Sequence, residues 1–183
     1  MKIFRIAKSK IMLDFPVLRQ STGYTCGVAS VAAILNYYGE EAKESDVIKE
    51  LKTTEDGTHY RNIIKFFNKR KFTVDENVNS IDKITECLKK DIPVLLEIQA
   101  WQDGNKSYKK NYKDGHYVVA IGIDNSKIYF YDPPSVNHTY IPIDELQDRW
   151  HDIEEDKEKT QNLGIAISGK KPKFDSEKII KMK

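Results

Sequence analysis

The sequence predicts an α+β fold in which one central buried helix packs on an antiparallel sheet. Three observations support this prediction. Residues 27–38 are apolar on almost every face, which is typical of a buried helix. Helical patterns dominate the first half of the chain and strand patterns the second, an order that indicates an α+β protein. Residues 116–124 and 127–132 are two apolar runs joined by a short turn, which predicts an antiparallel hairpin.

The composition is that of an ordinary globular protein with a charged surface. The chain has 183 residues, 39% of them hydrophobic and 32% charged, and this length can bury a core without disulfide or metal support. We expect one domain over residues 1–169 and a basic C-terminal tail over residues 170–183 that is unfolded or loosely helical. The net charge of +2 gives no indication of a nucleic-acid or membrane-surface ligand.

The cysteines and the N-terminus indicate the compartment. Cys26 and Cys87 do not make a disulfide framework and fit a reducing environment, although one bridge between them stays open. The first ten residues lack the apolar run of a signal peptide. No stretch approaches the ~20 apolar residues that span a bilayer. We therefore expect a cytoplasmic protein with no membrane span.

The first half of the chain carries the helical patterns. Thr25 is the expected N-cap of the buried helix, so Cys26 falls in its first turn, and Gly39 stands where a helix end favours a left-handed residue. Ser45 and Ser80 are expected to cap two further helices. An arm or strand is expected before Pro16, followed by a loop over residues 16–25. Helices are expected over residues 26–38, 45–51 and 60–70 and from residue 81, and a strand is expected over residues 72–74. Cys87 lies on the apolar stripe of the last of these helices.

Strand patterns dominate after Pro93. Residues 94–100, 116–124 and 127–132 are expected to form the sheet, with a short or edge strand over 139–143 because Pro142 cannot donate to a neighbouring strand. The other expected elements are a long polar loop over 101–115, a helix from Asp144 to about Trp150, a charged loop over 152–162 and a last strand over 163–167. His59, His138 and His151 are expected at the surface.

A cysteine, a histidine and an aspartate occur in an order that suggests nucleophilic catalysis. Cys26 begins the buried helix, His116 begins a strand, and Asp132 ends the next strand. If these strands pair as a hairpin, His116 and Asp132 meet at one edge of the sheet, where the carboxylate fixes the imidazole tautomer. A helix N-terminus and a nearby imidazole both favour thiolate over thiol, so Cys26 is the expected nucleophile. Gln20 and the backbone N–H of Cys26 are expected to stabilise the oxyanion.

Around these residues the chain resembles the papain-like cysteine peptidases related to the bacteriocin-processing, double-glycine-leader peptidases and their stand-alone relatives. The resemblance spans about residues 14–150. It implies a papain-like fold, hydrolysis of a peptide bond, and no metal or cofactor. It also implies a catalytic triad on Cys26, His116 and Asp132 with Gln20 as the oxyanion donor. The matching segments are residues 20–39, Asp56-Gly57-Thr58, residues 115–119 and Tyr131-Asp132-Pro133.

Two features differ from the processing peptidases. Those enzymes commonly have an acidic residue just before the cysteine, where this chain has Thr25, and they are usually fused to an ABC transporter, whereas this sequence ends at Lys183. The double-glycine specificity and any transporter or secretion partner therefore stay open. We expect a peptide or protein substrate in extended form, with Tyr24, Gly115 and Trp101 as candidate substrate-binding residues.

Several alternatives remain open from the sequence. The same triad could transfer an acyl or peptidyl group to an amine, or the fold could be a catalytically lapsed peptide-binding module. Cys26, His116 and Asp132 could instead bind Zn²⁺, although no CxxC or HExxH spacing supports a zinc site. Residues 101–112 mix aromatic and basic side chains, as nucleic-acid-binding segments do, but we expect this loop to face the substrate and no nucleic acid to bind.

Overall fold

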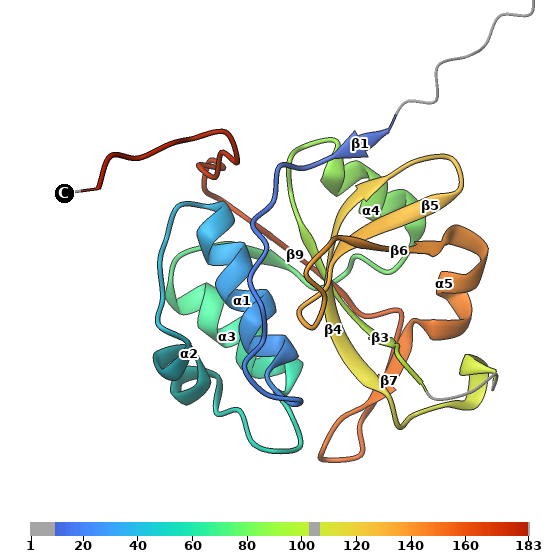
Figure 1. The fold of residues 1–183 in the computed structure, drawn as a ribbon. Helices are drawn as coiled ribbons and strands as arrows, with labels where there is room; N and C mark the ends of the chain where they lie inside the picture. Colours follow the sequence, from blue (N-terminus) through green and yellow to red (C-terminus); the bar gives the residue numbers. More distant parts are fainter. Residues whose placement is uncertain (1–9, 103–106, 183) are drawn as a thin grey trace, which may run out of the picture.

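The computed structural model of the chain describes residues 10–102 and 107–182. It contains a layer of helices on one side of an antiparallel sheet (Figure 1). In the view of Figure 1, α1 (Cys26–Tyr37), α2 (Glu44–Leu51) and α3 (Tyr60–Lys69) lie together to the left of the sheet. The helix α4 (Ile81–Leu88) packs against the central strands, and α5 (Ile143–Arg149) packs beside the edge strand.

The main sheet is antiparallel throughout, and this confirms the predicted α+β fold. Its strands run in the order β2-β9-β3-β4-β5-β6, and β1 pairs with one end of β4. The strand β6 lies at the edge, as Pro142 predicts. The bounds are β1 (Ile11–Met12), β2 (Thr73–Asp75), β3 (Val94–Gln99), β4 (Gly115–Ile123), β5 (Lys127–Tyr131), β6 (Thr139–Pro142) and β9 (Gly164–Ser168).

The helix α1 is the central element of the core and packs against β4. It begins at Cys26, as predicted, and Gly39 beyond its end adopts φ +76°. Thr25 occupies the N-cap position, but its side chain does not cap the helix. Its buried hydroxyl instead exchanges hydrogen bonds with the backbone of Thr22, which fixes the turn before Cys26. Within the first turn of α1, the backbone N–H of Gly27 hydrogen-bonds with the Cys26 thiol.

Three other predicted helix starts have different outcomes. Ser80 caps α4 by accepting from the N–H of Lys83, as predicted. Lys43 precedes α2 instead of Ser45, so the helix starts one residue before the predicted cap. Pro142 occupies the cap position of α5, so this helix begins at Ile143, one residue before Asp144.

The segment 152–162 is not the loop that its charge predicted. It contains most of a two-stranded hairpin formed by β7 (His151–Ile153) and β8 (Lys159–Gln161). The loop prediction was wrong because it assigned the charged residues to solvent, whereas Asp152, Glu154 and Thr160 of this hairpin are buried. Figure 1 shows the hairpin at the lower end of the sheet, beside β3.

The basic tail is partly packed. The backbone N–H groups of Lys173 and Phe174 both donate to the carbonyl of Tyr37, and Phe174 contacts the core. The N–H of Ser176 donates to the Asp14 carboxylate. Residues 173–176 therefore hold the C-terminal end of α1, where the sequence predicted an unfolded or loosely helical segment.

Two further features bear on the predicted compartment. Both Cys26 and Cys87 are free thiols, so the disulfide that the sequence left open does not form. Among the described residues, no helix combines the length and hydrophobicity that crossing a bilayer requires.

Candidate active site

The structure brings together the histidine and aspartate that the sequence singled out. His116 lies at the start of β4, and Asp132 directly follows β5, the next strand of the same hairpin. The His116 Nε2 atom lies 2.7 Å from Asp132 Oδ1, and both side chains are buried. Because Nε2 is engaged by the carboxylate, Nδ1 is the ring nitrogen left for Cys26.

Cys26 supplies a thiol whose surroundings favour its ionised form. The residue is 9% exposed and hydrogen-bonds with His116. Burial is the largest single influence and would raise the pKa of the thiol. The hydrogen bond and charge of His116, together with hydrogen bonds from the backbone N–H groups of Tyr117 and Gly27, outweigh burial and lower the pKa. Cys87 behaves in the opposite way, because burial and the nearby Asp75 raise the pKa of its thiol.

His116 is held in its charged form. Burial opposes the charge, but the hydrogen bonds to Asp132 and Cys26 and the charges of both partners raise its pKa to about 9. An imidazolium is therefore the main form of His116 at neutral pH, and its positive charge stabilises a thiolate on Cys26. This arrangement can perform nucleophilic attack at Cys26 and proton transfer at His116.

Gln20 lies in the loop next to this pair. Its backbone N–H donates to the carbonyl of Pro133, which ties the loop to the residue after Asp132. Its side-chain Nε2 donates to the carbonyl of Thr22 at 2.7 Å, so one of its two amide hydrogens is engaged. Gln20 and His116 line one wide cavity of about 750 Å³, which makes the amide available to a substrate in that cavity.

The three predicted substrate-binding residues fall in different places. Trp101 lines the wide cavity with Gln20 and His116, and it is 64% exposed. Gly115 lines a second, smaller cavity that also contains Cys26. Tyr24 is partly exposed but lines neither of these cavities. Trp101 and Gly115 thus line two different cavities, and His116 lines both of them.

The smaller cavity contains acidic residues that the sequence analysis missed. We call it the acidic cavity, because Asp56, Glu97, Asp152, Glu154 and Glu155 all line it together with Cys26 and His116. One sequence signal pointed to it. Glu97 and Gln99 are the polar residues in the otherwise apolar run of β3, yet both are fully buried. The other acidic residues lie on the 56–59 loop and on the hairpin that was predicted to be a loop.

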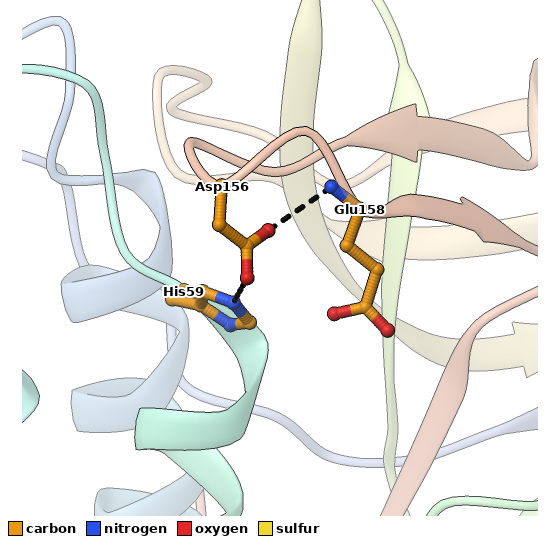
Figure 2. Close-up of side chains that lie close together, drawn as sticks. All are labelled: His59, Asp156 and Glu158. Atoms are coloured by element: carbon orange, nitrogen blue, oxygen red, sulfur yellow. Dashed lines mark hydrogen bonds and ion pairs between the residues drawn. The ribbon is translucent and has the colours of Figure 1, made fainter.

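A polar bridge crosses from the start of α3 to the β7–β8 hairpin beside the acidic cavity. Figure 2 shows His59, the residue before α3, close to Asp156 and Glu158 of the hairpin. His59 Nε2 lies 3.5 Å from Asp156, and the Arg61 guanidinium donates to Glu158 at 2.7 Å. The backbone N–H and the hydroxyl of Tyr60 donate to Glu154 and Glu158, each at 3.2 Å.

His59, Asp156 and Glu158 of this bridge lie close enough together to share a metal ion. Within residues 10–102 and 107–182, no other group of histidine, cysteine and carboxylate side chains does so. The atoms of these three residues already have partners. The Arg61 guanidinium pairs with Glu158, and His59 Nδ1 accepts from the backbone N–H of Arg61. The group is thus an ion-pair network, and Cys26, His116 and Asp132 do not form a shared ligand set.

The remaining histidines lie deeper than the sequence predicted. His151 is buried, its Nε2 atom lies 2.8 Å from the carbonyl oxygen of Asn111, and its ring packs against Tyr112. His59 and His138 are half-buried. The prediction of three surface histidines was therefore wrong for His151, because the unrecognised β7 strand carries it into the structure.

Comparisons with known proteins identify the family and the fold of this chain. The model of the Peptidase_C39 like family matches residues 12–158. The transport/processing ATP-binding protein ComA of Streptococcus pneumoniae is 28% identical over 131 residues, which are 68% of this chain and 16% of ComA. The chain thus spans about one sixth of the length of this relative.

Two solved structures share the fold. A putative C39-like peptidase from Bacillus anthracis superposes with a TM-score of 0.68 at 18% identity, covering 90% of this chain and 100% of that one. A double glycine motif protease from an AMS/PCAT transporter, solved in complex with the leader peptide, gives a TM-score of 0.60 at 20% identity. That match covers 88% of this chain and 94% of the other.

Proposed function

Because the chain belongs to the Peptidase_C39 like family, we propose that it is a cysteine peptidase whose catalytic residues are Cys26, His116, Asp132 and Gln20. The observation that carries this proposal is the pairing of a lowered thiol pKa at Cys26 with a pKa of about 9 at His116, next to a 2.7 Å contact with Asp132. Such a pair is a thiolate–imidazolium nucleophile at neutral pH.

The reaction begins with attack of the Cys26 thiolate on the carbonyl carbon of the scissile peptide bond. A carbon–sulfur bond forms, and the carbonyl electrons move to oxygen, where Gln20 Nε2 and the Cys26 backbone N–H stabilise the negative charge. His116 then donates its proton to the leaving amine as the carbon–nitrogen bond breaks. Asp132 orients the imidazole and supports its charge throughout.

The second half of the reaction releases the acyl group. His116, now neutral, accepts a proton from a water molecule as that water attacks the thioester carbon. The carbon–sulfur bond then breaks, which releases the carboxylic acid and leaves a thiolate on Cys26. His116 keeps the proton that it took from water, so the thiolate–imidazolium pair is restored. We propose a peptide or protein substrate in extended form and a cytoplasmic setting, because a free nucleophilic thiol needs a reducing compartment. No transporter partner is proposed.

Iodoacetamide labelling at pH 7 tests the nucleophile. Cys26 should react at least tenfold faster than Cys87, which has the raised pKa and serves as an internal control. His116→Ala should remove most of this difference without changing the rate at Cys87. Equal and slow labelling of both thiols in the wild-type protein would overturn the proposal and favour a lapsed peptide-binding module.

A peptide-library cleavage profile tests the reaction itself. Cleavage by the wild-type protein should disappear in Cys26→Ala, because no other described thiol adjoins His116. A strict need for glycine at both positions before the cut would add leader processing to the function. A reactive Cys26 that cleaves no peptide but transfers an acyl group to an added amine would replace the peptidase with a transferase.

A further inference from the structure

The turn before α1 links the proposed oxyanion donor to the helix that carries the proposed nucleophile. Thr22 lies at the centre of this turn, because its backbone carbonyl accepts from three groups. Gln20 Nε2 donates to it at 2.7 Å, the Thr25 hydroxyl at 3.2 Å and the Thr25 backbone N–H at 3.4 Å. One carbonyl oxygen therefore contacts both the amide of Gln20 and the residue that precedes Cys26.

Thr25 is held in place by the helix that follows it. Its side chain is buried, and its backbone carbonyl accepts from the N–H of Ala29 at 2.9 Å, which joins it to α1. Its hydroxyl also accepts from the backbone N–H of Thr22 at 3.1 Å. A hydroxyl offers one donor and two acceptor sites, so this one can bind both backbone groups of Thr22 at once. The position of α1 thus determines where the Thr22 carbonyl lies.

The side-chain amide of Gln20 depends on that carbonyl for its orientation. Its oxygen, Oε1, is buried and has no hydrogen-bonding partner among the described residues, so the contact of Nε2 with Thr22 is the hydrogen bond that orients the amide. A buried acceptor without a partner costs free energy, and the bond to Thr22 offsets part of that cost. Turning the amide over would place Oε1 against the Thr22 oxygen, and two acceptors repel each other.

We propose that Thr25 is a positioning residue for the oxyanion donor. Its hydroxyl holds the Thr22 carbonyl, and that carbonyl orients the amide of Gln20 beside the cavity that His116 lines. The inference rests on the proposed peptidase function, because the amide acts on a tetrahedral oxyanion. A donor stabilises developing charge only when it is already aimed at it. The helix that presents the nucleophile would therefore also aim the oxyanion donor.

Thr25→Val tests the inference, because valine keeps the shape of threonine and lacks the hydroxyl. An interaction made only in the transition state affects kcat and not KM, so kcat for peptide cleavage should fall about tenfold while KM changes less than about twofold. Thr25→Ser keeps a hydroxyl and should restore most of the lost kcat. The matched control is Thr85→Val, which removes a threonine hydroxyl that donates to a carbonyl in α4 at 2.8 Å and should leave kcat unchanged. Circular dichroism checks folding, and Thr25→Ala replaces Thr25→Val if the valine variant does not fold.

Alkylation of Cys26 separates positioning of the oxyanion donor from a general structural role. In the reaction with iodoacetamide a carbon–sulfur bond forms as iodide leaves a saturated carbon, so no oxyanion develops. Cys26 of Thr25→Val should therefore be alkylated within about twofold of the wild-type rate. A loss of alkylation as large as the loss of cleavage would mean that Thr25 only holds the nucleophile in place, and it would overturn the inference.

A double-mutant cycle with Gln20 gives the second readout. Gln20→Ala should lower kcat about a hundredfold, as expected for the loss of one oxyanion donor. In that background Thr25→Val should lower kcat less than about twofold further, because the amide that it orients is gone. Independent effects of the two substitutions, or an unchanged kcat in Thr25→Val alone, overturn the inference. Wild-type kcat in Gln20→Ala, or no cleavage by the wild-type protein, contradicts the proposed function instead, so the two failures are distinguishable.

Discussion

Replacing Asp132 by asparagine tests how the imidazolium is maintained. Asp132 is the leading favourable influence on His116, whose pKa rises from 6.5 to about 9. A rise of this size corresponds to about 3 kcal/mol in favour of the charged ring, shared between Asp132 and Cys26. Asp132→Asn removes the carboxylate charge but keeps an oxygen near Nε2, so the pKa should fall by at least about one unit, or ~1.4 kcal/mol.

The pH dependence of kcat/KM and of Cys26 alkylation measures this effect. Activity needs a deprotonated thiol and a protonated imidazole, so it should be present between the lowered pKa of Cys26 and the pKa of His116. In the wild-type protein, peptide cleavage should fall as the pH rises through about 9. In Asp132→Asn, that alkaline limit should move to lower pH, and a shift of one unit should lower cleavage at pH 8.5 about threefold.

The control for this substitution is Asp46→Asn, which changes an exposed carboxylate in α2. It should leave both pH limits in place. An Asp132→Asn variant that is folded by circular dichroism and keeps an alkaline limit near 9 would refute the reasoning. Cys26 would then hold the imidazolium without help from the aspartate.

Three further predictions follow from the packing and the proposed chemistry. Gly115→Ala should lower kcat/KM at least tenfold, because the new Cβ would meet the Asp152 carboxylate at 2.0 Å; steady-state kinetics that match the wild type would contradict this geometry. Tyr38→Phe removes a buried hydrogen bond to the Ile167 carbonyl and should lower the free energy of unfolding by about 1–2 kcal/mol, measured by urea denaturation. The activity per folded molecule should change little, and an unchanged urea midpoint would contradict the prediction. EDTA should leave cleavage unchanged, whereas a loss that Zn²⁺ restores would favour the zinc alternative.

The sequence predicted those parts of the fold that have strong local signals. The apolar faces of residues 26–38 required a buried helix, and the paired runs around the 124–127 turn required a hairpin. Together they predicted that His116 lies beside Asp132, and the two side chains are in contact in the structure. The catalytic roles of Cys26, His116, Asp132 and Gln20 stay predictions, because contact geometry does not measure turnover.

The acidic cavity could not be predicted because its residues come together only through tertiary structure. Glu97 lies on β3, whereas Asp152 and Glu154 lie on a hairpin whose charge is typical of a loop. Hydrophobic periodicity does not register buried carboxylates, since it assigns charged positions to solvent. For the same reason His151 was predicted at the surface, although its position on that hairpin buries it.

The polar bridge between α3 and the β7–β8 hairpin constrains the kind of substrate that can reach Cys26. It joins the helical half of the molecule to the sheet half through Tyr60, Arg61 and His59, right beside the acidic cavity. Widening the gap between the two halves would break these contacts together. A rigid, folded surface cannot reach a buried thiol without such widening, whereas a single unstructured strand can. Under the proposed peptidase function, the protein should therefore cleave only where a polypeptide is already unfolded, at a terminus, a linker or a leader. The flexibility of the target would then select the site before any side chain does.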